Sequence, residues 1–378
     1  MPNEGRDLGM VGLGVMGSNL VLNMAEHGFS LAGLDQDPQK VAQLQAQAEG
    51  GKVMATTDLI SFLEALRKPR AIMMMVPAGP PVDAVIRELL PHLEPGDVII
   101  DGGNSYYKDT NLRQRTLEEK GIQFLGVGIS GGEAGARHGA SMMPGGPQTA
   151  YERVEPMLKA VAARVGEEAC MAYLGPGSAG HYVKMVHNGL EYGIMQLIAE
   201  SYDLMKRGLK ISDDEIQQVF EAWNQGELNS YLIEITAEIF AKVDPGTGKR
   251  LIDLILDEAR QKGTGKWASQ DAMDLQVPLP TIDMAVNMRD ISGFKQDRLA
   301  GSKELPGPEI KLTLDKANFL EKMKNSLYAA ILITFTQGME LMQEASKAYG
   351  YGLDLATIAR IWRGGCIIRA AMLEPIRE

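Results

Sequence analysis

The chain has 378 residues, of which 45% are hydrophobic and 23% charged, and its formal net charge at pH 7 is −11. This composition is typical of a globular protein, and the length leaves room for two domains. The negative charge argues against a nucleic-acid partner, because phosphate backbones are bound by basic surfaces. No run is apolar enough to span a bilayer, and no signal-peptide pattern opens the chain. Two distant cysteines, Cys170 and Cys366, fit no disulfide or metal pattern, so a cytoplasmic location is expected.

The segment Gly12-Leu13-Gly14-Val15-Met16-Gly17 has the Gly-x-Gly-x-x-Gly spacing of a dinucleotide-binding turn. It follows the apolar run 8–11 and opens a helical pattern over 18–27. In such a unit the glycines permit a tight turn and close approach of a pyrophosphate, which the helix N-terminus then faces. The spacing alone is weak, because a chain with 42 glycines produces it by chance. Asp35 strengthens it, since an acid after the second strand-like run, 29–34, can accept hydrogen bonds from ribose hydroxyls.

The rest of the first half alternates short apolar runs with helical patterns. Strands are predicted at 71–76, 97–101 and 122–127, with amphipathic helices over 82–93 and 110–120. Strands joined by helical crossovers predict a mostly parallel, doubly wound sheet. Ligands of such sheets bind beyond the carboxyl ends of the strands. This rule singles out the loops Pro77-Ala78-Gly79, Gly102-Gly103-Asn104-Ser105 and Ser130-Gly131-Gly132-Glu133.

From residue 177 onward strand-like alternation disappears and long helical periodicities dominate. They cover 181–207, 213–224, 228–242 and 318–349. Helices this apolar bury more than one face, which indicates a subunit interface as well as a core. The predicted fold is therefore an α/β N-terminal Rossmann-type doubly wound sheet followed by an all-α domain. We expect residues 1–177 to bind a dinucleotide and residues 178–378 to bind the substrate and form a dimer.

One helix in the second half carries a polar stripe between apolar flanks. Lys184, His187, Asn188 and Glu191 stand at i, i+3, i+4 and i+7, and therefore share one helix face. An exposed face with intrahelical ion pairs is the alternative interpretation. The apolar flanks favour a buried helix, in which each polar group needs a partner. A lysine placed there can act as a base and a nearby carboxyl as an acid.

Two cationic features follow. The segment Gln261-Lys262-Gly263-Thr264-Gly265-Lys266-Trp267 combines a flexible backbone with two lysines, and it predicts either an oxyanion site or a solvated turn. It lacks the Gly-Lys-Ser/Thr ending of a P-loop. Arg289 lies in an apolar helical context and could clamp a phosphate through its planar guanidinium. No spacing of His, Cys and carboxylate residues predicts a metal site.

These motifs resemble those of the 6-phosphogluconate dehydrogenases. The matching segments, which span essentially the whole chain, are 101–105, 126–133, 180–189, 261–267 and 361–369. The resemblance implies oxidative decarboxylation of 6-phosphogluconate to ribulose 5-phosphate and CO2, a step of the pentose phosphate pathway and of gluconate utilisation. It also implies a nicotinamide cofactor, no metal, a small phosphorylated sugar-acid substrate and a homodimer.

Matched position by position, the resemblance implies a role for each site residue. Lys184 is the base on the substrate's 3-hydroxyl, and Glu191 is the acid that protonates C1 of the enediol. The sugar acid is held by Asn104, Ser130, Gly131, Gly132, His187 and Asn188, and its phosphate by Tyr192, Lys262 and Arg289. The cofactor is held by Gly12, Leu13, Gly14, Val15, Met16, Gly17, Asp35, Gln36, Asp37, Val76, Pro77, Ala78 and Asn104.

The sequence departs from the common family pattern at the second strand. Commoner members have Asn-Arg-Thr there, and the arginine binds the 2′-phosphate of NADP. Here the matching residues are Asp35, Gln36 and Asp37. A carboxylate repels that phosphate and suits the free 2′-hydroxyl of NAD, so NAD is expected to be preferred over NADP. Lys40, the nearby base, is expected to point to solvent from the following helix.

The family usually continues past the point where this sequence ends, with helices and a tail that carries an arginine and a histidine into the partner's site. We therefore expect a member without that segment. One alternative is another β-hydroxyacid dehydrogenase, such as one acting on 3-hydroxyisobutyrate. The Glu191-Tyr192 pair, Lys262 and Arg289 argue against it, because an unphosphorylated substrate needs no such cations. The other alternative is a non-catalytic NAD-binding module, against which Lys184 and Glu191 argue.

Overall fold

The computed structural model describes residues 5–305, 307 and 315–378 of the chain. Its described residues fall into two compact units. The first unit comprises the chain up to Met185, Ala345–Ile367 and Arg377, and the second comprises Val186–Glu344, Ile368–Ile376 and Glu378. Two of the divisions lie inside long helices, α8 (Ala179–Asp203) and α14 (Lys316–Tyr349).

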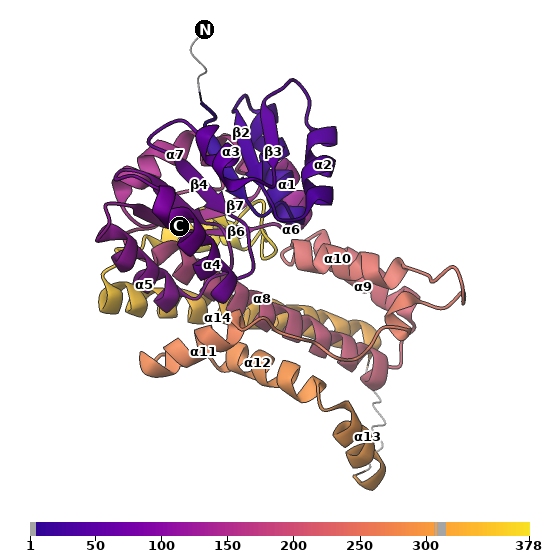
Figure 1. Ribbon diagram of the computed structural model, residues 1–378. Helices are drawn as coiled ribbons and strands as arrows, with labels where there is room; N and C mark the ends of the chain where they lie inside the picture. Colours follow the sequence, from indigo (N-terminus) through magenta and orange to yellow (C-terminus); the bar gives the residue numbers. More distant parts are fainter. Residues whose placement is uncertain (1–4, 306, 308–314) are drawn as a thin grey trace. The chain divides into compact units, whose positions relative to one another are not determined.

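A seven-stranded sheet forms the centre of the first unit (Figure 1). Its order is β3-β2-β1-β4-β5-β6-β7, and every neighbouring pair is parallel except β6 and β7. The strands are β1 Leu8–Val11, β2 Leu31–Leu34, β3 Val53–Thr56, β4 Ala71–Met74, β5 Val98–Asp101, β6 Gln123–Ser130 and β7 Ser141–Gly145. A separate hairpin consists of β8 (Arg164–Val165) and β9 (Glu168–Ala169). The predicted doubly wound, mostly parallel sheet is confirmed.

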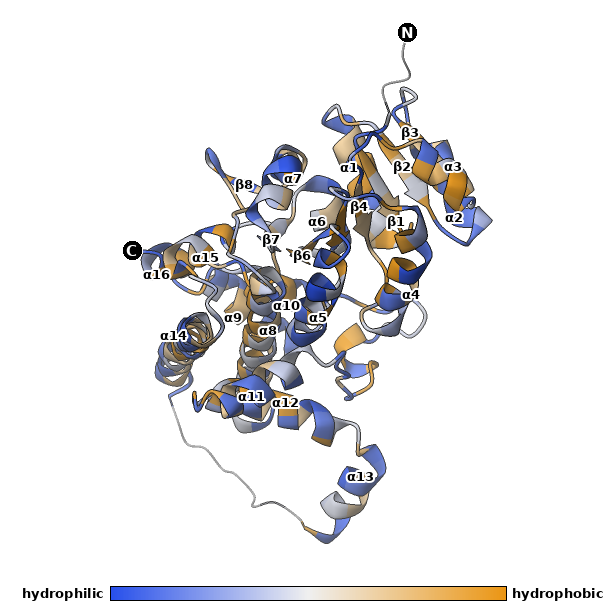
Figure 2. Ribbon diagram, turned by 60° about the vertical axis from the view of Figure 1, so that its left-hand side comes forward, coloured by the Kyte–Doolittle hydropathy of each residue, from blue (hydrophilic) through white to orange (hydrophobic). Residues whose placement is uncertain are grey.

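Helices cover both faces of this sheet. They are α1 Val15–Glu26, α2 Pro38–Gln47, α3 Leu59–Glu64, α4 Pro80–Leu89, α5 Tyr107–Glu118, α6 Gly132–His138 and α7 Gln148–Ala160. Because strand side chains alternate, Met73 joins the core under α1 and α7, whereas Ile72 and Met74 join the core under α3 and α4. The central strands are therefore apolar on both faces, as their orange colour in Figure 2 shows.

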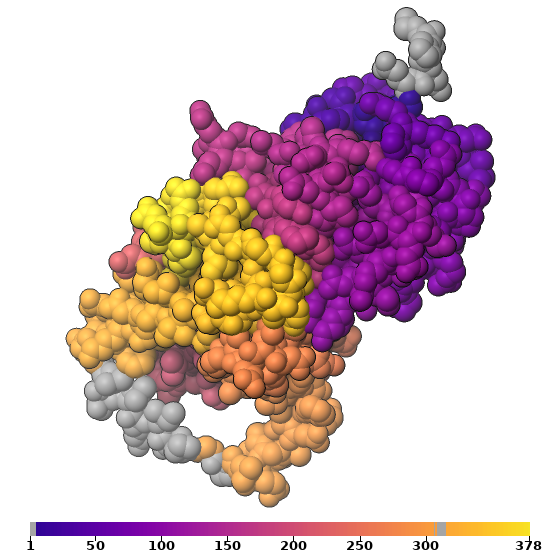
Figure 3. Space-filling view, turned by 90° about the vertical axis from the view of Figure 1, so that its left-hand side faces the viewer, coloured from indigo at the N-terminus to yellow at the C-terminus, as the bar shows by residue number. Residues whose placement is uncertain are grey.

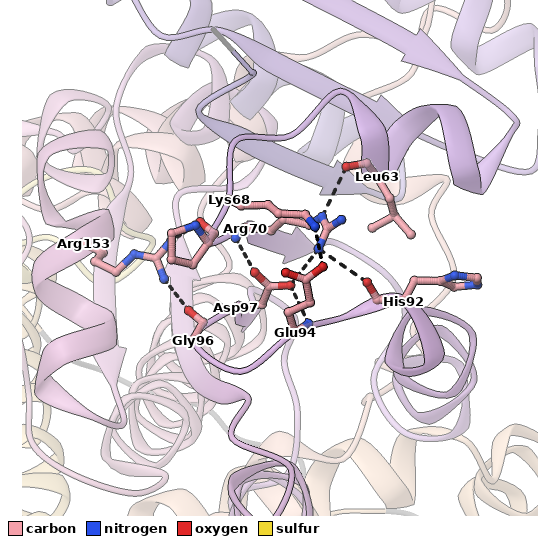
Figure 4. Close-up of polar contacts among 9 residues, drawn as sticks. Leu63, Lys68, Arg70, His92, Glu94, Gly96, Asp97 and Arg153 are labelled. Atoms are coloured by element: carbon pink, nitrogen blue, oxygen red, sulfur yellow. Dashed lines mark hydrogen bonds and ion pairs between the residues drawn. The ribbon is translucent and has the colours of Figure 1, made fainter.

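A buried ion pair ties the amino ends of two central strands together (Figure 4). Arg70 precedes β4 and Asp97 precedes β5, and their Nη1 and Oδ2 atoms are 3.1 Å apart. The guanidinium also donates through Nε to the Leu63 carbonyl at 3.2 Å, and Asp97 accepts the Glu94 N–H at 3.0 Å. These groups lie at the strand ends opposite the expected ligand site, so we assign them to stability.

The segment Ala345–Ile367 lies in the first unit and includes α15 (Leu355–Ile361). Figure 3 shows this part of the chain, in yellow, against the magenta residues that precede α8. Ser141 donates its hydroxyl to the Ile361 carbonyl at 2.8 Å, and Arg360 donates to the Ala169 carbonyl at 2.8 Å. This segment therefore covers β7 and β9.

The second unit is helical. Besides parts of α8 and α14, it contains α9 Asp213–Asn224, α10 Tyr231–Ala241, α11 Thr264–Asp274, α12 Pro280–Ser292, α13 Lys295–Glu304 and α16 Leu373–Ile376. Its described residues contain none of the named strands, which confirms the predicted all-α second half. Over the residues that the structure describes, no helix is long and apolar enough to cross a membrane.

Candidate active site

The glycine turn joins β1 to α1, and its three glycines meet different surroundings. Gly12 has φ +94°, and a Cβ there would lie 2.7 Å from the Met75 carbonyl oxygen. A Cβ on Gly17 would lie 2.0 Å from the Gly12 carbonyl oxygen. A Cβ on Gly14 would meet no heavy atom within 4 Å, and no side chain caps α1 there. The fold itself therefore requires glycine at residues 12 and 17. Gly14 instead leaves open space in front of the uncapped N–H groups of α1, and this space fits a pyrophosphate.

Asp35 supports this turn directly. Its Oδ2 accepts the Leu13 N–H at 2.7 Å, and its Oδ1 accepts the Asp37 N–H at 2.9 Å. Asp37 in turn accepts the Gln39 N–H at 2.9 Å and thereby caps α2. The carboxylate of Asp35 thus holds both the glycine turn and the start of α2 in place.

The expectation that Lys40 points to solvent was wrong. Its Nζ lies 3.5 Å from Asp35 Oδ2, although 43% of the lysine side chain remains exposed. Lys40 stands in the first turn of α2, and its four-carbon stem is long enough to bring the ammonium back to the carboxylate. The acid at the end of β2 is therefore accompanied by a partly solvated cation.

A cavity of about 260 Å³ opens beside Asp35. It is lined by Val11, Gly12, Leu34, Asp35, Gln36, Val76, Pro77, Pro81, Ala84, Val85 and Glu88. The apolar wall suits a flat base, and the carboxylates of Asp35 and Glu88 suit hydroxyl or amino groups. The sequence analysis did not predict the four cavity residues that come from α4, which are Pro81, Ala84, Val85 and Glu88. Their signal was the amphipathic pattern over 82–93, one face of which had no assigned partner.

The other predicted loops also lie at carboxyl ends of neighbouring strands. Val76, Pro77 and Ala78 follow β4, and Asn104, whose side chain is exposed, follows β5. Ser130 ends β6, and Gly131 comes next with φ +116°. With the glycine turn after β1, four adjacent strands contribute to one edge of the sheet.

Lys184 lies on the part of α8 that belongs to the first unit, and it is buried, with 6% of its surface exposed. A Cβ on Gly128 of β6 would lie 2.4 Å from the Cβ of Lys184, so only glycine allows α8 to approach the strand so closely. Ser130 stands two residues further on the same face of β6. The structure therefore brings the predicted base to the strand that ends in Ser130.

The rest of the polar stripe belongs to the second unit. His187 is fully buried, and its Nδ1 lies 3.2 Å from Asn188 Oδ1, so Nδ1 is the protonated ring nitrogen. Glu191 is half-buried. With Lys184 and His187 both buried, the alternative of an exposed helix face with intrahelical ion pairs is wrong.

Three predicted phosphate ligands come from the second unit, Tyr192 from α8, Arg289 from α12 and Lys262 from the loop before α11. The guanidinium carbon of Arg289 lies 3.7 Å from the ring centroid of Tyr192, and Nη1 of Arg289 donates to the Arg260 carbonyl at 2.8 Å. A Cβ on Gly265 would lie 2.5 Å from the same tyrosine ring, so the start of α11 packs against it. Lys262 is exposed just before α11. A cavity of about 530 Å³ is lined by Tyr192, Arg289 and neighbouring residues.

Within the described part of the chain, no group of three or more His, Cys, Asp or Glu side chains is arranged to hold a metal ion. The described residues supply a dinucleotide turn and a buried amine in the first unit, and a carboxyl group and cations in the second. These are the features of dinucleotide-dependent dehydrogenases.

Comparison with known families defines the class further. The family model for the NAD binding domain of 6-phosphogluconate dehydrogenase matches residues 7–175, and that for the 6-phosphogluconate dehydrogenase C-terminal domain matches residues 180–378. The chain belongs to the 6-phosphogluconate dehydrogenase family.

Two proteins of Bacillus subtilis strain 168 illustrate the relationship. The NADP(+)-dependent, decarboxylating 6-phosphogluconate dehydrogenase is 50% identical over 99% of this chain and 80% of its own length. The NAD(+)-dependent, decarboxylating enzyme is 49% identical over 98% of this chain and 80% of its own length. The 6-phosphogluconate dehydrogenase of Plasmodium falciparum, solved with NADP+ and with 6-phosphogluconate, superposes with a TM-score of 0.94 at 44% identity. That match covers 98% of this chain and 80% of the Plasmodium chain.

Proposed function

We propose that the chain catalyses the oxidative decarboxylation of 6-phosphogluconate to ribulose 5-phosphate and CO2, with NAD as the preferred oxidant. The observation that carries the proposal is family membership over both halves of the chain. The buried lysine on α8 and the arginine stacked on Tyr192 support it. We assign dinucleotide binding to residues 1–177 and substrate binding and dimerisation to residues 178–378.

Lys184 is the proposed general base. Burial disfavours a charged amine, and the neutral amine can take the proton of the substrate's 3-hydroxyl. When bound at the glycine turn, the nicotinamide cofactor supplies the hydride acceptor for C3. The 3-keto acid then breaks its C1–C2 bond, CO2 leaves, and the electron pair remains in an enediolate. Glu191 protonates the carbon that becomes C1 of ribulose 5-phosphate, so the proton taken from the hydroxyl is balanced by the proton added at carbon.

The remaining site residues bind and orient the substrate. Arg289 and Lys262 provide the positive charge for the substrate phosphate, and the Tyr192 ring holds the guanidinium in place by a cation–π contact. We assign the hydroxyl and carboxylate contacts to Asn104, Ser130, Gly131, Gly132, His187 and Asn188. A local cationic site is needed because the chain as a whole carries a net charge of −11.

The preference for NAD rests on the charges around the end of β2. Asp35 and Glu88 both line the cavity there, and either carboxylate would repel a 2′-phosphate. Lys40 offsets part of that repulsion from 3.5 Å. At this distance an exposed pair is worth roughly 1 kcal/mol, or about fivefold in affinity. Replacement of Lys40 by alanine should therefore raise the ratio of kcat/KM for NAD to that for NADP about fivefold.

The second unit also supports the proposed homodimer. Met284, Met288 and Ile291 are exposed on α12 at i, i+4 and i+7, which forms one apolar stripe. We expect sedimentation equilibrium to give twice the chain mass, and Met288→Glu to shift the protein toward monomer. A wild-type protein that stays monomeric at micromolar concentration would contradict the assignment.

The substrate is tested by a panel of acids with NAD. We expect NADH formation with 6-phosphogluconate and little with gluconate or 3-hydroxyisobutyrate, because the cations have no role without a phosphate. Oxidation of 3-hydroxyisobutyrate in preference to 6-phosphogluconate would favour the alternative β-hydroxyacid dehydrogenase. NAD binding without oxidation of any of the three acids would favour a non-catalytic module.

A further inference from the structure

A buried polar network lies under the loops at the carboxyl ends of β4 and β5. At its centre is Asp101, the last residue of β5, which is fully buried. Its Oδ1 accepts the Gly103 N–H at 3.0 Å, and its Oδ2 accepts the Ser105 hydroxyl at 2.6 Å. These two bonds fix both sides of Asn104, the residue assigned to substrate and cofactor.

Arg113 of α5 connects that loop to the preceding one. Its buried guanidinium donates through Nη1 to Ser105 Oγ at 3.4 Å and through Nη2 to the Gly79 carbonyl at 3.1 Å. Its Nε donates to Asp83 Oδ1 at 2.7 Å, and Nη1 lies 3.7 Å from Asp101 Oδ2. A planar guanidinium can hold all these acceptors at once, which the rotating ammonium of lysine cannot. The loops carrying Ala78 and Asn104 are therefore joined through one side chain.

His181 connects the same network to the helix of the proposed base. It stands on α8, one turn before Lys184, and its Nε2 lies 3.0 Å from the Asp101 carbonyl oxygen. A carbonyl only accepts, so Nε2 carries the proton and Nδ1 accepts the Thr110 hydroxyl at 2.7 Å, a shorter contact than the 3.3 Å from that hydroxyl to the Tyr106 carbonyl. Burial lowers the pKa of His181, which agrees with a neutral ring in this tautomer.

Thr110 and Arg113 are three residues apart on α5, and they therefore face the same side of that helix. Thr110 contacts His181 of α8, the helix that carries Lys184. Arg113 binds Ser105 and Gly79 in the two loops. Although α5 is largely hydrophilic in Figure 2, both side chains are buried and serve this network instead of facing solvent.

We propose that Thr110 and Arg113 are positioning residues for hydride transfer, because together they fix Lys184 relative to the loops that carry Ala78 and Asn104. The proposal rests on the function proposed above. A displacement of about 1 Å between reacting groups can cost about a hundredfold in rate. Loosening the network should therefore slow the chemical step while leaving the substrate contacts of the second unit in place.

The chain provides a matched control for each position. Thr116, on the exposed side of α5, donates its hydroxyl to the Leu112 carbonyl within the helix. Arg115, also exposed, donates to the Asn111 carbonyl within the helix. We would compare Thr110→Val with Thr116→Val, and Arg113→Lys with Arg115→Lys. A further variant, Thr110→Ser, keeps the hydroxyl and loses only the methyl group.

The readouts are kcat, KM for 6-phosphogluconate, the melting temperature and the kinetic isotope effect on kcat with substrate deuterated at C3. For Thr110→Val and Arg113→Lys we expect kcat to fall about ten- to hundredfold, with KM changed less than about threefold. The isotope effect should rise, because hydride transfer becomes rate-limiting. Thr110→Ser should recover most of kcat, and both control variants should match the wild type.

Equal kcat in Thr110→Val and Thr116→Val would overturn the positioning role. A fall in kcat with an unchanged isotope effect, or without recovery in Thr110→Ser, would assign the network to stability alone and would also overturn it. A wild-type protein inactive on 6-phosphogluconate would overturn the proposed function together with this inference. Activity of the wild type therefore distinguishes the two failures.

Discussion

Replacement of Gly14 by alanine tests the proposed cofactor site while leaving the fold intact. Gly14 has φ −69° and ψ −174°, which alanine adopts readily, and a Cβ there would meet no heavy atom within 4 Å. Gly14→Ala should therefore leave the free energy of unfolding within about 1 kcal/mol of the wild type. The new methyl would occupy the space that we assign to the pyrophosphate. An overpacking cost of about 1–3 kcal/mol corresponds to roughly a 5- to 150-fold rise in the Kd for NAD.

Gly17→Ala provides the opposite case on the same turn. Its Cβ would lie 2.0 Å from the carbonyl oxygen of Gly12, which is backbone and cannot move aside without shifting β1 or α1. We expect the free energy of unfolding to fall by about 1–3 kcal/mol or more. The two alanines thus differ in stability although they are three residues apart.

The assay is isothermal titration of each variant with NAD, together with urea unfolding of the same samples. Loss of NAD affinity in Gly14→Ala with unchanged stability is the expected result. If Gly14→Ala bound NAD as tightly as the wild type, the pyrophosphate could not lie at the start of α1. If Gly17→Ala were as stable as the wild type, the steric reasoning on the turn would be wrong.

Three further predictions concern catalysis, substrate binding and stability. Lys184→Ala and Glu191→Gln should each lower kcat about a hundredfold or more in steady-state assays, with the Kd for NAD unchanged, because general acid–base catalysis is lost; near-normal turnover would refute either role. Arg289→Ala should raise KM for 6-phosphogluconate roughly 10- to 150-fold and leave KM for NAD unchanged, since a charged hydrogen bond is worth roughly 1.5–3 kcal/mol; an unmoved KM would contradict the phosphate assignment. Asp97→Ala should lower the free energy of unfolding by about 3–5 kcal/mol in urea titrations, because it leaves the buried Arg70 without its carboxylate. The control Glu94→Ala removes the exposed pair with Lys68 and should lower it by about 1 kcal/mol or less, and equal losses would show that burial does not matter there.

Much of the sheet could be predicted because its strands are apolar on both faces. The runs at 71–76 and 97–101 correspond to β4 and β5, and the glycine turn fell between β1 and α1 as expected. β3 and β7 were missed. β3 lies at one edge of the sheet with only Ala55 buried, and β7 lies at the other edge, contains Pro144 and pairs antiparallel. Short or proline-containing edge strands carry too little periodicity to be recognised.

The positions of site residues could be predicted where a motif determines the backbone. The contacts of individual side chains could not be predicted, because they depend on the tertiary structure. The loops after β4, β5 and β6 were placed correctly by the rule on carboxyl ends. The direction of the Lys40 side chain was not predicted, because a long side chain in the first turn of a helix can reach back to a carboxylate in the preceding loop. Thr110 and Arg113 looked like part of an ordinary amphipathic helix, since spacing does not distinguish a buried polar face from an exposed one.

The most direct test of the proposed function is the reaction of the purified protein with 6-phosphogluconate and either NAD or NADP. Reduced cofactor would be followed by absorbance at 340 nm, and CO2 would be trapped from the same reaction. We expect one CO2 for each NADH formed, and a kcat/KM for NAD about tenfold or more above that for NADP. NADH without CO2 would contradict oxidative decarboxylation, and a higher kcat/KM with NADP would contradict the role assigned to Asp35.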